Sequence, residues 1–164
     1  CHPAHRRGPR PARGATGSTR TGTQGADMSA FTGDRIRRLA AWADRFGDPS
    51  FSFGRWIPST TGADGVINLG WFEISEAGQE FVSEMHALGW VYGFDWMQWL
   101  ATPKGQELSR SPSSIAGATA DDLARLLTAI IRGERFGDGE LEGAFESGIL
   151  LAIARRAWDL EPRR

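Results

Sequence analysis

The chain has 164 residues, a length typical of one domain with a short extension. Its 19 lysines and arginines and 20 aspartates and glutamates give a formal net charge of -1, which argues against direct nucleic-acid binding through a basic surface. One cysteine and three histidines exclude an intramolecular disulfide and leave few ligands for structural zinc, so no metal and no cofactor is predicted. No apolar run approaches the ~18 residues that span a bilayer, so no membrane partner is expected.

The first 27 residues differ in composition from the rest of the chain. They contain five arginines and one aspartate but no Val, Ile, Leu, Phe, Trp or Tyr. Such a segment buries too little apolar surface to offset its ordering entropy, so residues 1–27 are predicted to be disordered. A transit peptide, a nucleic-acid contact or a lipid-modified terminus would each need apolar or clustered basic residues that this segment lacks. Because the composition changes at Met28, we interpret it as the natural start and residues 28–164 as a single domain.

A helix and a β-hairpin are predicted in the first part of this domain. Apolar residues such as Ile36 and Leu39 recur at helical spacing, which predicts an amphipathic helix over residues 33–46. Aromatic residues then alternate with glycine and proline. This pattern favours two short strands, near residues 51–57 and 66–72, with a turn-like spacer between them.

Two further helices are predicted in the middle of the chain. Ser75 fits the N-cap of a helix with an apolar face that ends at Gly89. Asp95 has a glutamine three residues later, so it fits the N-cap of a helix that starts at Trp96. Pro103 shortens or kinks this helix.

The strongest core signal follows Thr119, which fits the N-cap of a helix. Its apolar face consists of Leu123, Leu126, Leu127, Ile130 and Ile131. Asp138 fits the N-cap of a short helix with Leu141, and Gly148 separates that helix from a last apolar run. The sequence therefore predicts a mainly α fold of five or six short helices in one compact domain, with a small β-hairpin between the first and second helices.

Few residues indicate catalysis. His86 is alone on its predicted helix, and such a histidine is more often a surface side chain than a base. The glycines of the C-terminal third lack the spacing of a phosphate-binding loop. One constellation remains, in which Glu146 with Arg132 and Arg135 forms a substrate clamp and Asp95 is a further candidate. The favoured interpretation is structural: a pair between Glu146 and an arginine that fixes a loop.

Seven tryptophans against one tyrosine suggest an aromatic binding surface. Trp96 and Trp99 lie one turn apart on the predicted third helix and are the candidate binding residues. The favoured interpretation is that these two form a core edge, and that Trp42 and Trp158 belong to helix faces, because a small domain needs large aromatic side chains for packing.

Several segments also match the pattern of a known family. They are Phe94-Asp95-Trp96 with Trp99, Asp122-Leu123 before Leu126-Leu127-Thr128, Arg132 with Arg135-Phe136, and Phe145-Glu146-Ser147-Gly148. In these residues the chain resembles the bacterial family DUF6508, over about residues 72–160. The resemblance implies a small cytoplasmic bacterial protein with the fold of that family, and it implies no mechanism.

Two functional hypotheses follow. The first is a non-catalytic domain that acts through a macromolecular partner, either a protein or a nucleic-acid-associated partner, because no nucleophile, base pair or metal set is recognisable. The alternative is a small enzyme of unrecognised type that uses Asp95, Arg132, Arg135 and Glu146. A cavity that joins these four side chains would favour the enzyme, and an exposed tryptophan patch would favour the binding domain.

Overall fold

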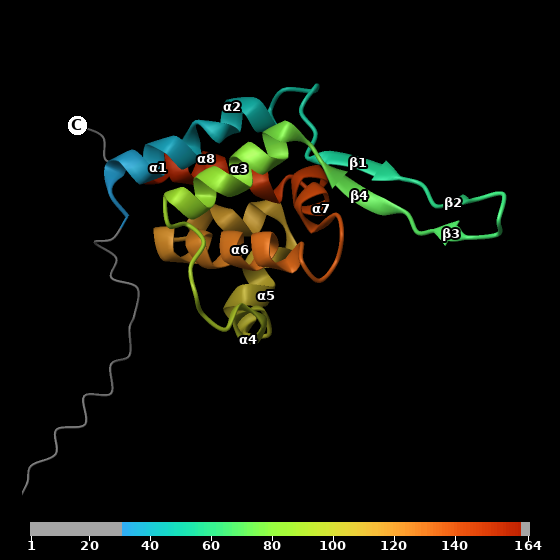
Figure 1. Cartoon of the computed structure of the whole chain (residues 1–164). Helices are drawn as coiled ribbons and strands as arrows, with labels where there is room; N and C mark the ends of the chain where they lie inside the picture. Colours follow the sequence, from blue (N-terminus) through green and yellow to red (C-terminus); the bar gives the residue numbers. More distant parts are fainter. Residues whose placement is uncertain (1–30, 162–164) are drawn as a thin grey trace, which may run out of the picture.

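A computed structural model describes residues 31–161 of the chain. The predicted disorder of residues 1–27 and the interpretation of Met28 as the start lie outside the described residues. Within the described range, helices form one mainly α body, and a long β-hairpin projects from it (Figure 1). The predicted fold class is confirmed.

The described residues contain eight α-helices rather than five or six. They are α1 (Gly33–Ala40), α2 (Trp42–Phe46), α3 (Glu76–Ala87), α4 (Trp96–Leu100), α5 (Pro103–Arg110), α6 (Ala120–Gly133), α7 (Glu140–Glu146) and α8 (Ile149–Leu160), with a 3-10 helix η2 (Pro112–Gly117) before α6. Two of the predicted helices are each divided in two. The first divides at Ala41, whose backbone stays right-handed. The third divides because Pro103 has no N–H for the helix ladder and starts α5 instead.

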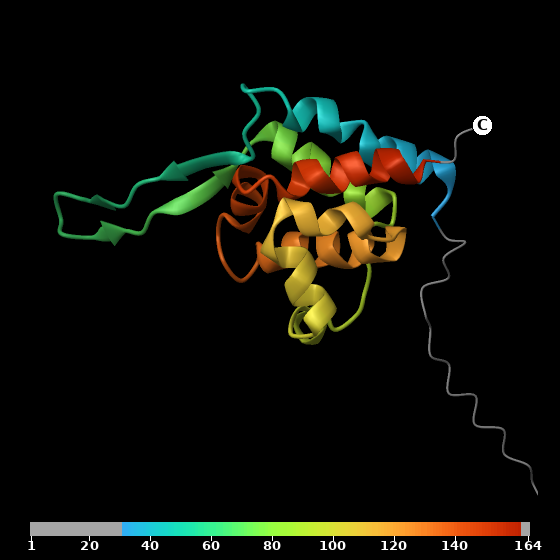
Figure 2. The same cartoon turned by 180° about the vertical axis from the view of Figure 1, so that it is seen from behind.

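The hairpin predicted between the first two helices is also confirmed, with shorter strands than expected. β1 (Gly54–Ile57) pairs antiparallel with β4 (Trp71–Ile74), and β2 (Thr60–Thr61) pairs with β3 (Ile67–Asn68). Both ladders keep one continuous register, with Ile57 opposite Trp71 and Thr60 opposite Asn68. We call residues 54–74 the arm, and both views show it extending away from the helices (Figures 1 and 2).

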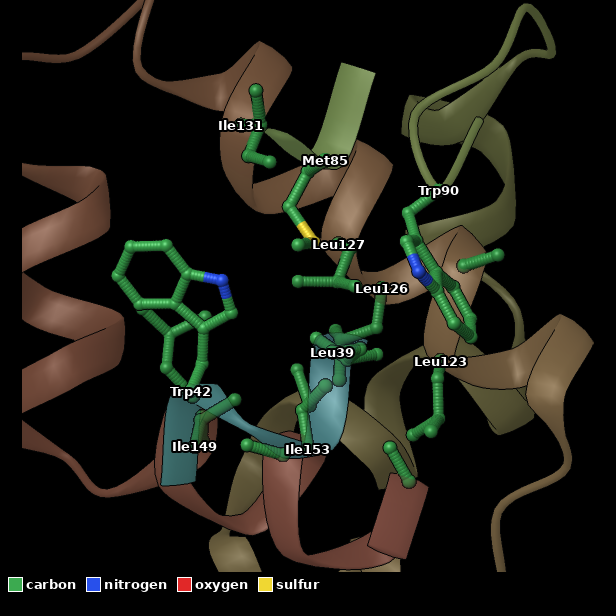
Figure 3. Close-up of a cluster of buried hydrophobic side chains, with 14 of the residues drawn as sticks. Leu39, Trp42, Met85, Trp90, Leu123, Leu126, Leu127, Ile131, Ile149 and Ile153 are labelled. Atoms are coloured by element: carbon green, nitrogen blue, oxygen red, sulfur yellow. The ribbon is translucent and has the colours of Figure 1, made fainter. Parts of the chain in front are cut away.

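The core lies where the long helices meet. α1 and α2 pack along α8, and α6 lies beneath them (Figure 2). Figure 3 shows Leu39 from α1, Leu127 from α6 and Ile153 from α8 pointing toward one another, and all three are fully buried. Most of the predicted α6 face is buried as expected, whereas Ile130 is partly exposed.

The helix caps follow the sequence at three of four predicted positions. Ser75 accepts a hydrogen bond from the N–H of Gly78, and Asp95 accepts one from that of Gln98. Thr119 forms a reciprocal capping box with Asp122. The expected cap at Asp138 is wrong, because the next residue, a glycine with a φ of 89°, occupies the N-cap of α7.

Candidate functional site

One face of the arm is apolar and exposed. Because side chains alternate along a strand, the continuous register places Ile57, Ile67, Leu69 and Trp71 on the same face. Ile67, Leu69 and Trp71 are 64%, 79% and 49% exposed, and Ile57 is half-buried. We call these four residues the outer face of the arm.

The opposite face packs on the helical body near the arm's base. Trp56 lies opposite Phe72, with ring centroids 5.3 Å apart, and Phe72 is buried. The ring of Trp56 also covers Gly139, where an added Cβ would lie 2.9 Å from Trp56 Cζ2. The glycine therefore allows both the left-handed turn into α7 and the close approach of the indole.

Backbone and carboxylate hydrogen bonds fix the base of the arm. The N–H of Phe53 donates to Glu142 of α7 at 2.9 Å, and the Phe53 carbonyl accepts from the N–H of Ser75 at 2.7 Å. Burial raises the pKa of Glu142, the hydrogen bond from Phe53 opposes this shift, and the charge of Glu146 adds to it. Hydrogen bonds at Phe53, before β1, and at Ser75, after β4, therefore fix both ends of the arm where it joins the body.

The arm carries little charge. Its charged residues are Arg55, Asp64 and Glu73, and the first and last form an ion pair of 2.7 Å across the strands. Asp64 lies in the tip, where it accepts from the N–H of Val66 at 3.1 Å. Each described strand pairs with one neighbour, so each keeps one edge without a strand partner.

The structure separates the four candidate catalytic residues. Arg132 and Arg135 line the same cavity, between α3 and the end of α6. Asp95 is exposed at the start of α4, and Glu146 is exposed on α7, and neither lines that cavity. Among residues 31–161, neither arginine pairs with Glu146, so the expected structural pair is absent there.

The candidate binding tryptophans lie mainly in the body. Trp99 is 8% exposed and packs in the core, and Trp96 is half-buried, with its ring centroid 6.0 Å from that of Phe136. The expectation that Trp158 packs through a helix face is wrong, because its side chain is 62% exposed. Trp56 and Trp71 are the exposed tryptophans of the arm, and they lie on its opposite faces. The alternation that ends at Trp71 is the sequence signal for the outer face.

These elements define a mainly helical domain with a projecting, apolar β-arm. The chain belongs to the family of unknown function DUF6508, whose model matches residues 31–163. No curated protein and no solved structure matches the chain. In the part that the structure describes, no helix has the length and apolar character to cross a membrane, and no group of three or more potential ligands is placed to hold a metal ion.

Proposed function

We propose that this chain is a non-catalytic protein-binding domain that acts through the outer face of its arm. The proposal rests on the concentration of exposed apolar side chains in the arm. Of the eight large apolar side chains exposed within the described residues, five belong to the arm, and three of these, Ile67, Leu69 and Trp71, lie on its outer face. A contiguous apolar surface of this kind marks an interaction site more often than scattered single residues do.

The low intrinsic stability of a two-stranded hairpin supports the proposal that a partner packs against the arm. A two-stranded hairpin is marginally stable in water unless a further strand or an apolar face packs against it. The base of this arm packs on the body through Phe72, whereas three of the four outer-face residues, Ile67, Leu69 and Trp71, remain exposed among the described residues. Low charge and exposed tryptophan are also typical of the centre of a protein interface.

The partner that this surface fits best is a second copy of the same chain. A two-fold contact brings the same patch of both subunits together, so the patch must be complementary to itself. The outer face meets this condition because its four residues are apolar. The nearest charges on the same face, Arg55 and Glu73, neutralise each other within one arm and leave no net charge to repel the second copy.

The enzyme alternative has less support. A catalytic site needs its acid, base and binding groups within reach of one substrate. Asp95 and Glu146 do not line the cavity that holds Arg132 and Arg135. The proposal keeps the cytoplasmic location that the family resemblance implies.

Light scattering coupled to size-exclusion chromatography tests the proposal. At protein concentrations up to about 1 mM, where even a weak interface is populated, we expect a mass approaching twice the chain mass of 17.9 kDa. Leu69→Asp places a charge in the centre of the outer face and should weaken dimerisation about tenfold or more.

Phe136→Asp is the matched control, because Phe136 is 76% exposed but lies outside the arm. This variant should dimerise like the parent chain. A monomeric parent chain at the highest concentration, or equal effects of the two substitutions, would overturn the proposal.

A further inference from the structure

A cavity of about 370 Å³ lies at the root of the arm, between α3, the end of α6 and the start of α7. Its polar side is formed by His86, Arg132, Glu134 and Arg135. Both arginines bring a permanent positive charge to the cavity lining. The cavity is separate from the outer face of the arm, so a ligand here would be an additional property of the domain.

Glu134, the one carboxylate that the described residues bring to this lining, already accepts two backbone hydrogen bonds. Glu134 Oε1 accepts from the N–H of Gly139 at 2.9 Å, and Oε2 accepts from the N–H of Leu141 at 2.8 Å. Both oxygens therefore hold the loop that leads into α7. The two guanidinium charges in the cavity wall are not balanced by an ion pair with this residue.

The Nε atom of Arg132 is buried and has no hydrogen-bond partner among the residues that the structure describes. The carbonyls at the end of α6 are also occupied, since Arg132 O accepts from the N–H of Arg135 and Gly133 O from that of Phe136. A guanidinium that is partly desolvated and unpaired favours an anion from outside the chain.

The rest of the cavity lining is apolar. It consists of Ile74, Val82, Ile131 and Leu141. A cavity of this volume, with apolar walls and a few convergent polar groups, fits a small organic ligand. A ligand that matches this lining combines an anionic group with an apolar group.

We infer that this cavity binds a phosphate monoester with a small apolar substituent. A phosphate monoester carries a charge of about -1.5 to -2 at pH 7, which matches two guanidiniums better than a carboxylate does. The planar donors of arginine suit the geometry of phosphate oxygens. The ester's organic part packs against the apolar wall, and His86 lies on the polar side as a further donor.

Isothermal titration calorimetry of the full chain with phenyl phosphate tests this inference. We expect a Kd of about 1 mM or tighter. Inorganic phosphate should bind more weakly because it lacks the apolar part, and benzoate should bind more weakly because it carries one charge. Arg132→Gln should weaken phenyl phosphate binding by about 10- to 100-fold, the effect of losing a charge-assisted contact.

Arg155→Gln is the matched control, because Arg155 is exposed on α8 and does not line this cavity. It should leave the affinity unchanged. If circular dichroism shows that Arg132→Gln does not fold, Arg135→Gln replaces it, since Arg135 is exposed and its loss removes the other positive charge of the cavity.

Three results would overturn the inference. The first is no binding of phenyl phosphate at millimolar concentration, which would leave the arginines only the role of balancing the dipole at the end of α6. The second is equal binding by the Arg132→Gln and Arg155→Gln variants. The third is tighter binding of benzoate than of phenyl phosphate, which would exclude a phosphate monoester as the preferred ligand.

Discussion

The carboxylate of Glu142 accepts a hydrogen bond from the backbone N–H of Phe53 at 2.9 Å, which ties α7 to the residue just before the arm. Phe53 itself is fully buried, so this bond joins the arm to the core and not to another surface loop. On the other strand, Ser75 both donates to Phe53 O and caps α3. A hairpin that extends into solvent is thereby held in one orientation at its base.

Glu142→Gln tests the electrostatic side of this contact. The glutamine keeps an acceptor for the Phe53 N–H and removes a charge at a position where burial raises the pKa of the carboxyl. A carboxyl with a raised pKa stabilises the fold in its protonated form, and this contribution is lost as the pH rises through the folded-state pKa. In urea unfolding at pH 7 we expect Glu142→Gln to be at least as stable as the parent chain, with the difference closing toward acidic pH.

Glu142→Ala is the companion variant, because it removes the acceptor altogether. The part-buried N–H of Phe53 is then unpaired, and stability should fall by about 1–3 kcal/mol. If the Gln variant were as unstable as the Ala variant at pH 7, the charge and not the hydrogen bond would be the stabilising feature, contrary to this account.

The importance of Glu142 could not be predicted from the sequence. Glu142 and Glu146 are one turn apart on α7, and the sequence pattern of the helix gives no reason to assign them different roles. Glu146 was singled out because arginines lie nearby in sequence, yet it is exposed, while Glu142 reaches a backbone N–H that is 89 residues away in the chain. Only the tertiary fold distinguishes the two carboxylates.

Features set by local sequence were predicted more successfully. The N-cap at Thr119 and the apolar face of α6 depend on residues within a few turns of one another; the N-cap is confirmed, and the face is buried except at Ile130. The hairpin was predicted from its alternation and turn residues, but its outer face was not. Which face a strand exposes depends on where the helical body lies, and periodicity alone does not contain that information.

Leu127→Ala tests the buried face of α6. Leu127 is fully buried at the centre of the core (Figure 3), so its truncation should cost about 2–5 kcal/mol in chemical denaturation. Arg125→Ala is the comparison on the same helix. Its ion pair with Asp121 is partly exposed, and its loss should cost about 0.2–1 kcal/mol. Equal costs would mean that α6 is packed through a different face.

Thr128→Val tests the buried polar link between α6 and the segment before α4. The Thr128 hydroxyl is buried and accepts from the N–H of Tyr92 at 3.3 Å. Valine has nearly the same shape but leaves that N–H unpaired, so stability should fall by about 1–3 kcal/mol. Thr128→Ser keeps the hydroxyl, and its thermal midpoint should lie above that of the Val variant. The reverse order would show that methyl packing matters more than the hydrogen bond.

Gly139→Ala tests the turn that receives the ring of Trp56. A side chain there is strained by the φ of 89° and meets the indole at 2.9 Å, so we expect a loss of about 1–2 kcal/mol. Gly143→Ala is the control within α7, where an added Cβ meets no neighbour, and it should stabilise the helix by about 0.5–1 kcal/mol. Urea unfolding of both variants measures the contrast, and a neutral effect at Gly139 would contradict the described packing of Trp56.

The most direct test of the proposed function is a cross-link between two arms. Cys1 is the single cysteine, so Cys1→Ser gives a background in which one new cysteine can be placed at Leu69, within the outer face. A two-fold contact through this face brings the two Leu69→Cys side chains close together, and mild oxidation at a concentration where the parent chain dimerises should give a disulfide-linked dimer in high yield. Trp158→Cys, exposed on α8, is the control and should remain largely monomeric. Equal cross-linking of the two variants, or none at position 69, would contradict the assignment of the arm as the interface.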